Sequence, residues 1–414
     1  MRLGRLVIAL ALLVVTSAAG PETVLRVYVT AQARPDVMRE ALDRFQRENP
    51  GIVAEIETGG STSELQSQYL NTTLSASDPS LDVFLLDVVR PAQFAASDWL
   101  VPLDNVVGNK TAFLKQYLPA YAEADDVSGK LVALPAFADA MFLYYRSDLL
   151  KKYHLPVPKD WNGLARESQT ILRGEHRPAL QGVSFQGAAI EGSVCTFLLP
   201  YWSQGNTLGT PGHLEFNDAA AARSLGLWSD FVHSGVAPAN AGEVTTDQTR
   251  QDFEAGNAVF AVLWSYGWGY FQGTDSAVRG KTAVAPLPAM PDGRSVSCLG
   301  GWQWGVSAFT RHRPEATRLV RFLATPYVAK LLSVKAGVLP ALTALYTDRD
   351  VLAANPWYSE VRAIMQTAHA RPVTPRYNET SYVIRTTVNA VLAGITTPTT
   401  GAAEIGSGLK RTMR

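Results

Sequence analysis

The chain has 414 residues, of which 47% are hydrophobic and 18% are charged, a balance typical of a folded globular protein rather than a disordered one. Its 37 lysines and arginines are matched by 37 aspartates and glutamates, so it lacks the basic excess that nucleic-acid binding needs. A chain of this length is expected to form two domains rather than one.

The first twenty residues have the layout of a secretory signal peptide. Residues 1–5 ("MRLGR") carry two arginines, an apolar run of ten follows, and small residues close the segment. We expect cleavage after Ala19 and export to the periplasm. The alternative is an uncleaved membrane anchor, although a spanning helix needs about 20 apolar residues.

The next segment predicts a β-α-β unit. Residues 24–29 alternate like a half-buried strand, and five apolar residues at helical spacing follow. Asn49-Pro50-Gly51 ends that helix, and residues 52–57 again have a strand pattern. Such a unit favours a parallel or mixed sheet.

Similar signals continue along the chain. Ser61 and Glu64 have the spacing of a capping box that opens a helix. Residues 82–87 ("DVFLLD") form a continuous apolar strand, as expected at the centre of a parallel sheet, and residues 141–146 form another. Ser147 is expected to cap the helix after that strand.

The second half alternates helices and strands without internal repeats. No long Gly/Ser linker occurs, so short crossing segments must join the two domains. The predicted helices cover residues near 191–203, 218–233, 247–256, 313–326 (ended by Pro326) and 380–394, and the predicted strands cover 258–264, 282–288 and 304–309.

The only two cysteines, Cys195 and Cys298, lie far from the cleavage point, which excludes a lipid-modified cysteine at the mature N-terminus. One distant pair is no disulfide framework. We expect two buried thiols, although the sequence leaves their pairing open.

The common catalytic motifs are missing from the sequence. It contains neither a phosphate-binding glycine loop nor a G-x-S-x-G nucleophile motif. The six histidines are scattered, without the spacing of metal ligands. We therefore expect no cofactor and no bound metal.

Three carboxylates lie at predicted strand or helix ends beside aromatic residues, namely Asp87, Asp139 and Glu191. A pair of carboxylates could hydrolyse a glycosidic bond. Alternatively, they bind sugar hydroxyls without performing chemistry.

Several tryptophans lie beside glycines, in "LWSYGWG" (263–269) and "GGWQWG" (300–305). Flat aromatic rings stack on the apolar face of a sugar, and glycine lets backbone approach a ligand closely. The alternative is that these are ordinary core tryptophans.

In the order of these motifs the chain resembles the extracellular solute-binding proteins of ABC sugar importers, the group that includes maltose-binding protein, and within it the trehalose/maltose-binding proteins. The resemblance covers nearly the whole mature chain. It is carried by "RFQRENPGIVAEIE", "DVFLLDVVRPAQFAASDWLVPLD", "LVALPAFADAMFLYYRSDLLKKY", "EGSVCTFL", "QDFEAGNAVFAVLWSYGWGYF", "VAPLP", "LGGWQWGVSAF" and "RPVTPRY".

The resemblance implies an α/β fold of two interleaved lobes with a hinge and a ligand in the interlobe cleft. The N-terminal lobe would comprise residues 20–136 and 303–338, and the C-terminal lobe residues 137–302 and 339–414, after a signal peptide at 1–19. It implies sugar contacts from Ser61, Asp87, Asp139, Trp264, Gly300, Gly301, Trp302 and Arg371, with weaker support for Glu191 and Tyr266.

One departure bears on specificity: relatives can carry an arginine about five positions after the residue matching Ser61, where this chain has Gln66. We expect a monomeric receptor that needs no cofactor, binds an α-glucoside disaccharide such as trehalose or maltose, and docks on ABC permease subunits in the membrane. The alternatives are a secreted glycoside hydrolase, or a receptor for another polar solute such as a polyol or glucosylglycerol.

Overall fold

The structure is a computed structural model that describes residues 22–30, 33–59, 63–210 and 212–413. The predicted signal peptide and Ser61, with its capping box, lie outside these residues.

A single nine-stranded sheet runs through the molecule in the order β2-β1-β3-β12-β6-β10-β7, with β11 paired to β6 and β13 paired to β12. Two further two-stranded sheets pair β4 with β5 and β8 with β9. The strands are β1 Thr23–Val29, β2 Ile52–Thr58, β3 Val83–Asp87, β4 Asp126–Val127, β5 Lys130–Leu131, β6 Leu134–Arg146, β7 Gln181–Ser184, β8 Gly209–Thr210, β9 His213–Leu214, β10 Ala258–Trp264, β11 Thr282–Ala285, β12 Ser297–Val306 and β13 Ala368–Ala370.

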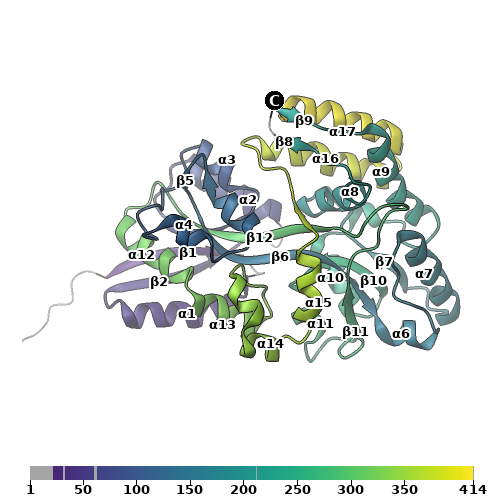
Figure 1. Cartoon of the computed structure of the whole chain (residues 1–414), viewed down its shortest axis with the longest axis horizontal. Coiled ribbons are helices and arrows are strands. Elements are labelled where there is room, and N and C mark those ends of the chain that lie inside the picture. Colours follow the sequence, from purple (N-terminus) through teal and green to yellow (C-terminus); the bar gives the residue numbers. More distant parts are fainter. Residues whose placement is uncertain (1–21, 31–32, 60–62, 211, 414) are drawn as a thin grey trace, which may run out of the picture.

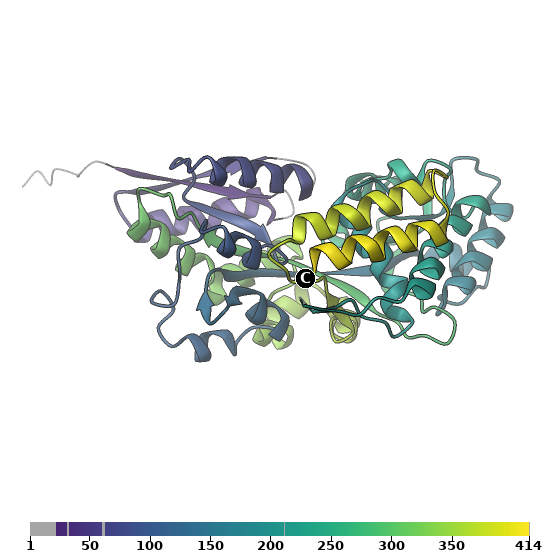
Figure 2. The same ribbon diagram turned by 90° about the horizontal axis from the view of Figure 1, so that it is seen from above.

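The strand directions confirm the predicted β-α-β unit. Strand β1 pairs parallel with both β2 and β3, and β10 pairs parallel with β7. Strand β12 runs antiparallel to its neighbours β3 and β6. Because β6 and β12 are long and adjacent, they connect the two ends of the sheet (Figures 1 and 2).

Helices cover the sheet in two groups and form two lobes (Figure 1). The first lobe holds β1–β3 with α1–α5, α12 and α13, and the second holds β7, β10 and β11 with α6–α10, α16 and α17. The helices are α1 Pro35–Glu48, α2 Ser63–Ser75, α3 Pro91–Ala96, α4 Lys110–Leu114, α5 Pro119–Asp125, α6 Ser147–Lys152, α7 Trp161–Glu175, α8 Glu191–Ser203, α9 Asp218–His233, α10 Thr246–Glu254, α11 Gly267–Phe271, α12 Arg313–Leu323, α13 Pro326–Ala336, α14 Arg349–Ala354, α15 Tyr358–Met365, α16 Tyr377–Leu392 and α17 Pro398–Thr412, with short 3₁₀ helices at Ala241–Glu243 and Thr343–Thr347.

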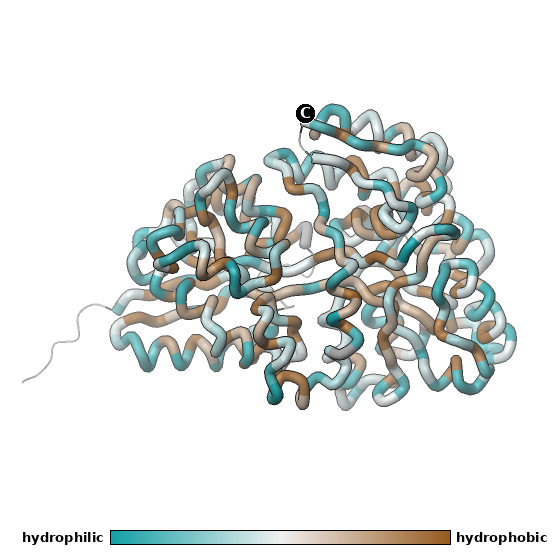
Figure 3. Tube along the Cα trace, viewed as in Figure 1, coloured by the Kyte–Doolittle hydropathy of each residue, from teal (hydrophilic) through white to brown (hydrophobic). Residues whose placement is uncertain are grey.

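Each lobe has its own apolar core. The first is built on residues such as Phe45, Trp304 and Leu319, and the second on Trp161, Phe197 and Leu225. Hydrophilic and hydrophobic residues alternate along the turns of the outer helices, as expected of helices with one face on a core (Figure 3). In the part of the chain that the structure describes, no helix is long and apolar enough to span a membrane.

Several details of the predicted elements were wrong or incomplete. Ser147 does not cap α6, because its hydroxyl donates to the carbonyl of Lys281 instead. Strand β12 begins at Ser297, seven residues before the predicted start at 304. Glycines are weak strand formers, but pairing with β3 and β6 on either side holds this segment in the sheet. Pro326 opens α13 as well as following α12, because proline suits the first turn of a helix.

The expectation of two buried thiols was also wrong. Cys195 on α8 and Cys298 on β12 form a disulfide, with a Cα–Cα distance of 5.8 Å. That distance lies in the usual range for a disulfide. The sequence could not reveal it, because 103 residues separate the two cysteines and only the fold packs α8 against β12.

Candidate functional site

Five of the ten predicted site residues lie on three adjacent strands, within two positions of one another in the sheet. Trp302 on β12 pairs with Asp87, the last residue of β3. On the other side of β12, Gly300 pairs with Asp139 of β6. Residues from three separate sequence motifs therefore meet where the two long strands pass between the lobes.

Aromatic rings occupy the positions where Gly300 and Gly301 would carry side chains. A Cβ on Gly300 would lie 2.5 Å from the Trp264 ring, and one on Gly301 would lie 2.4 Å from the Tyr121 ring. The hydroxyl of Tyr121 donates to the Gly300 carbonyl at 2.6 Å. Gly301 also has φ of +126°, which favours glycine. The paired glycines thus let two rings pack directly on the β12 backbone.

The carboxylate of Asp139 is almost fully buried and fixed on one side. Its Oδ1 accepts hydrogen bonds from the amides of Ala140 and Ser265, at 2.9 and 2.8 Å, and from the Ser265 hydroxyl. Burial raises the pKa of Asp139 to about 7, against the lowering effect of these hydrogen bonds. Among the described residues, none donates a hydrogen bond to Oδ2.

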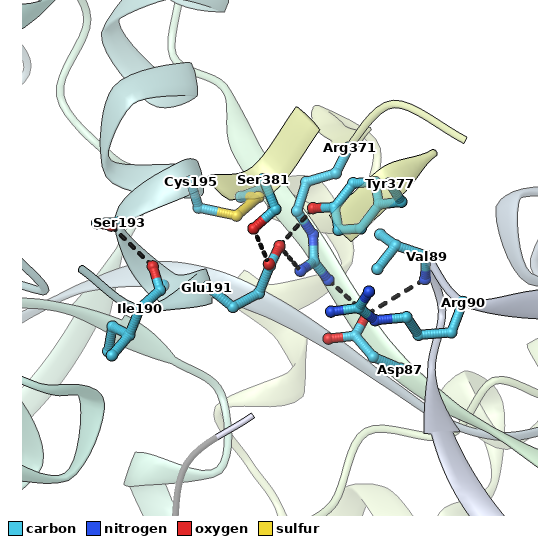
Figure 4. A network of polar contacts seen from close by, with 12 residues as sticks. Asp87, Val89, Arg90, Ile190, Glu191, Ser193, Cys195, Arg371, Tyr377 and Ser381 are labelled. Carbon is cyan, nitrogen blue, oxygen red and sulfur yellow. Dashed lines mark hydrogen bonds and ion pairs between the residues drawn. A yellow bond between two sulfur atoms is a disulfide. The ribbon is translucent and has the colours of Figure 1, made fainter. Parts of the chain in front are cut away.

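Arg371 joins the two lobes through two ion pairs (Figure 4). Its Nη2 contacts Oδ1 of Asp87 in the first lobe, and its Nη1 contacts Oε1 of Glu191 in the second, both at 2.7 Å. The Arg371 side chain is only 1% exposed. This arginine follows β13 directly, so its position depends on the pairing of β13 with β12.

Glu191, the first residue of α8, is the centre of a buried network. Besides Arg371, it accepts hydrogen bonds from the hydroxyls of Tyr377 and Ser381, both on α16. Burial would raise the pKa of Glu191, but the charges of Arg371 and Arg90 and the two hydroxyls hold it below its ordinary value. Glu191 therefore stays ionised, and its hydrogen bonds orient α16 and Arg371.

The sequence patterns did not single out Arg90, Tyr377 or Ser381 as site residues. Arg90 follows β3 in the first lobe, donates to Asn378 on α16 of the second, and lies 5.2 Å from the Tyr377 ring centroid. It forms no ion pair with a carboxylate among the described residues. No local motif marks it, and a lone arginine after a strand gives no functional signal by itself.

A groove of about 750 Å³ opens between the lobes beside this network. Ser67, Gln68 and Asn71 of α2 line the first-lobe side, while Ser381 and Tyr382 of α16 line the second-lobe side. Arg90 and Glu191 also line this groove, so the buried network contacts the space between the lobes.

The remaining predicted residues differ in their exposure. The Trp264 ring is half-buried and lies 5.9 Å from the Arg371 guanidinium. Trp302 is 7% exposed and packs in the first-lobe core, with its ring centroid 6.4 Å from that of Phe137. Tyr266 lines a second interlobe cavity of about 450 Å³, and its buried hydroxyl has no hydrogen-bond partner among the described residues. Within the described ranges, no group of three or more metal-ligating side chains occurs.

Known proteins share this architecture. The bacterial extracellular solute-binding protein family model matches residues 31–330. A "Probable ABC transporter-binding protein" of Deinococcus radiodurans is 34% identical over 333 residues, which cover 78% of each chain. A "Mannitol-binding protein" of Pseudomonas aeruginosa is 22% identical, covering 70% of this chain and 67% of its own.

Among solved structures, maltose-bound MalE3 of T. maritima superposes with a TM-score of 0.88 at 31% identity, covering 94% of this chain and 99% of that one. A solute-binding protein of Agrobacterium vitis with bound D-mannitol has a TM-score of 0.80 at 19% identity and shares the fold. Because the family model spans well over half of the residues and the two-lobe fold agrees with it, this chain belongs to the bacterial extracellular solute-binding protein family.

Proposed function

We propose that this chain is the substrate-binding component of an ABC carbohydrate importer and that it binds an α-glucoside disaccharide such as maltose or trehalose. The observation that carries the proposal is the cluster of Asp87, Trp302, Gly300 and Asp139 on the adjacent strands β3, β12 and β6. A relative of nearly the same fold and 31% identity is bound to maltose.

The chemistry of these residues suits a sugar. Oδ1 of Asp87 and Oδ1 of Asp139 are held by protein donors, so each carboxylate keeps a second oxygen for ligand hydroxyls. The half-buried Trp264 ring offers a flat apolar surface next to them. Gly300, Gly301 and Trp302 complete the proposed site, and Ser61 and Tyr266 are proposed as further sugar contacts.

Arg371 and Glu191 have a supporting part in this proposal. Both side chains are nearly fully buried, and Arg371 uses its guanidinium to contact Glu191 and Asp87. We therefore assign them to orienting the site, and Asp87 and Asp139 to contacting the ligand.

The proposal also includes the division of the chain into two lobes. Residues 20–136 with 303–338 would move against residues 137–302 with 339–414, after removal of the signal peptide at 1–19. The closed, monomeric receptor would then dock on permease subunits, without performing chemistry on the sugar. Asp87 and Glu191 both form ion pairs with Arg371, so neither is free to act as the acid or base of glycoside hydrolysis. This supports sugar binding over hydrolysis.

A polyol is the second candidate ligand, because a relative and a structural neighbour are named for mannitol. A thermal-shift panel of maltose, trehalose, mannitol and glucosylglycerol separates the candidates, since a ligand that binds only the folded state raises its melting temperature. We expect the largest shift with a disaccharide. A shift with mannitol alone would replace the disaccharide proposal with the polyol one.

A further inference from the structure

The disulfide links α8 to β12 next to β13, and these three elements carry or directly precede Glu191, Gly300 and Arg371. Cys195 and Cys298 are both fully buried in the core of the second lobe. Figure 4 shows the disulfide beside the network of Glu191, Arg371 and Tyr377.

On its helix side, the cross-link holds the start of α8. Cys195 follows Glu191 by four residues, and residues four apart lie on the same helix face about one turn from each other. Fixing Cys195 to the sheet therefore fixes the height and rotation of α8 at Glu191.

On its strand side, the cross-link holds the segment that leads to Arg371. Cys298 pairs with His369 and Leu299 pairs with Ala370, the residue directly before Arg371. Two residues after Cys298, Gly300 lies opposite Asp139 and under the Trp264 ring. One covalent bond thus connects the backbone of Glu191 with the two strands that carry Arg371 and Gly300.

We propose that the Cys195–Cys298 disulfide is a positioning element of the binding site, which sets the distance between Glu191 and Arg371 and through Arg371 the orientation of Asp87. A shift of α8 against β12 would separate Glu191 from Arg371, and the Asp87 carboxylate would lose its fixed partner. The disulfide therefore contributes to ligand affinity as well as to stability. Its effect on affinity rests on the proposed function.

The test compares four proteins: wild type, Cys195→Ala/Cys298→Ala, Glu191→Gln, and the variant with all three changes. Maltose affinity is measured by calorimetry at a temperature where denaturant curves show every variant to be folded. We expect the double cysteine variant to bind about 2- to 30-fold more weakly, the range for residues that act through a coupled network. Glu191→Gln should add little to that loss, because both changes disturb the same ion pair.

Leu198→Ala is the matched control. Leu198 is fully buried on the same helix, so its truncation destabilises α8 while the cross-link stays in place. This control should bind maltose as tightly as wild type. A cysteine variant that is less stable yet binds like wild type would show that the disulfide is only structural and would overturn the inference. Two titratable thiols in wild-type protein unfolded without reductant would also overturn it.

Hydrogen exchange separates this inference from the proposed function. If wild type binds no sugar, the proposed function fails, but amide exchange in the unliganded proteins still decides the inference. We expect faster exchange at residues 187–195 and 368–377 in the cysteine variant, whereas Leu198→Ala should speed exchange in α8 and leave residues 368–377 unchanged. Unchanged exchange in the cysteine variant would contradict the positioning role.

Discussion

At the scale of single residues, the proposed site contains carboxylates whose burial disfavours the charged form. Asp139 is the clearest case, because burial raises its pKa from 3.8 to about 7. Between these values the folded protein holds a proton that the unfolded chain has released, so this group lowers the free energy of unfolding as pH rises. Above about 7 both states are ionised and the slope vanishes.

We therefore expect Asp139→Asn to remove part of the pH dependence of stability between about 4 and 7. Urea unfolding of wild type and variant at a series of pH values measures the difference in slope. Glu191→Gln is the contrasting variant, because the folded-state pKa of Glu191 is lowered and its stabilisation is lost as pH falls. Equal slopes for wild type and Asp139→Asn would show that Asp139 is ionised throughout.

Trp302 and Trp264 should respond differently to truncation. Trp302 is 7% exposed, so Trp302→Ala is expected to cost roughly 3–5 kcal/mol of stability from lost packing, whatever its share in sugar contact. Trp264 is only half-buried, so Trp264→Ala should mainly weaken sugar binding and remove a ligand-dependent change in fluorescence. Denaturant unfolding and calorimetry on both variants check this pair. Normal binding by Trp264→Ala would remove that ring from the site.

At the scale of elements, Arg371 links the end of β3 in the first lobe to the start of α8 in the second. Arg371→Leu would leave Glu191 buried without its cation, at a cost of about 3–5 kcal/mol in the free energy of unfolding. Arg371→Lys keeps the positive charge but cannot contact both carboxylates at once. We therefore expect it to be more stable than Arg371→Leu but to bind sugar more weakly than wild type. Denaturant unfolding measures both variants, and equal stability of Arg371→Leu and wild type would contradict the structural role of this network.

The elements also show what the sequence could and could not predict. Apolar runs and helical spacing located β1, α1, β2, β3, α8 and β10 to within a few residues, because those signals are local. The start of β12 was missed, since Gly300 and Gly301 are weak strand formers and only their neighbours in the sheet hold them. Arg90, Tyr377 and the disulfide depend on contacts between segments about 100 or more residues apart, which periodicity does not encode.

The site residues illustrate the same limit. Their identities came from motif order and from the resemblance to sugar-binding proteins, and the structure brings Asp87, Asp139, Gly300 and Trp302 together on three adjacent strands. The sequence could not predict which residues orient the site and which contact the ligand. Arg371 and Glu191 become buried only when β13, α8 and α16 pack together. Ligand contact by these residues stays a prediction.

At the scale of the whole molecule, two lobes joined by β6 and β12 suggest closure around a ligand (Figure 2). Few segments cross between the lobes, so a hinge motion needs little rearrangement of either core. We expect saturating maltose to reduce the radius of gyration measured by small-angle X-ray scattering. The Asp87→Ala/Asp139→Ala double variant is the control and should show no such change. An identical radius in wild type with and without bound maltose would argue against closure.

The most direct test of the central claim is a calorimetric titration of maltose into the purified protein. We predict saturable binding with one site per chain and a heat signal that returns to baseline after each injection. A signal that persists after injections would indicate turnover and favour a glycoside hydrolase. If neither maltose nor trehalose gives a heat of binding at any temperature tested, the chain is not a receptor for these disaccharides.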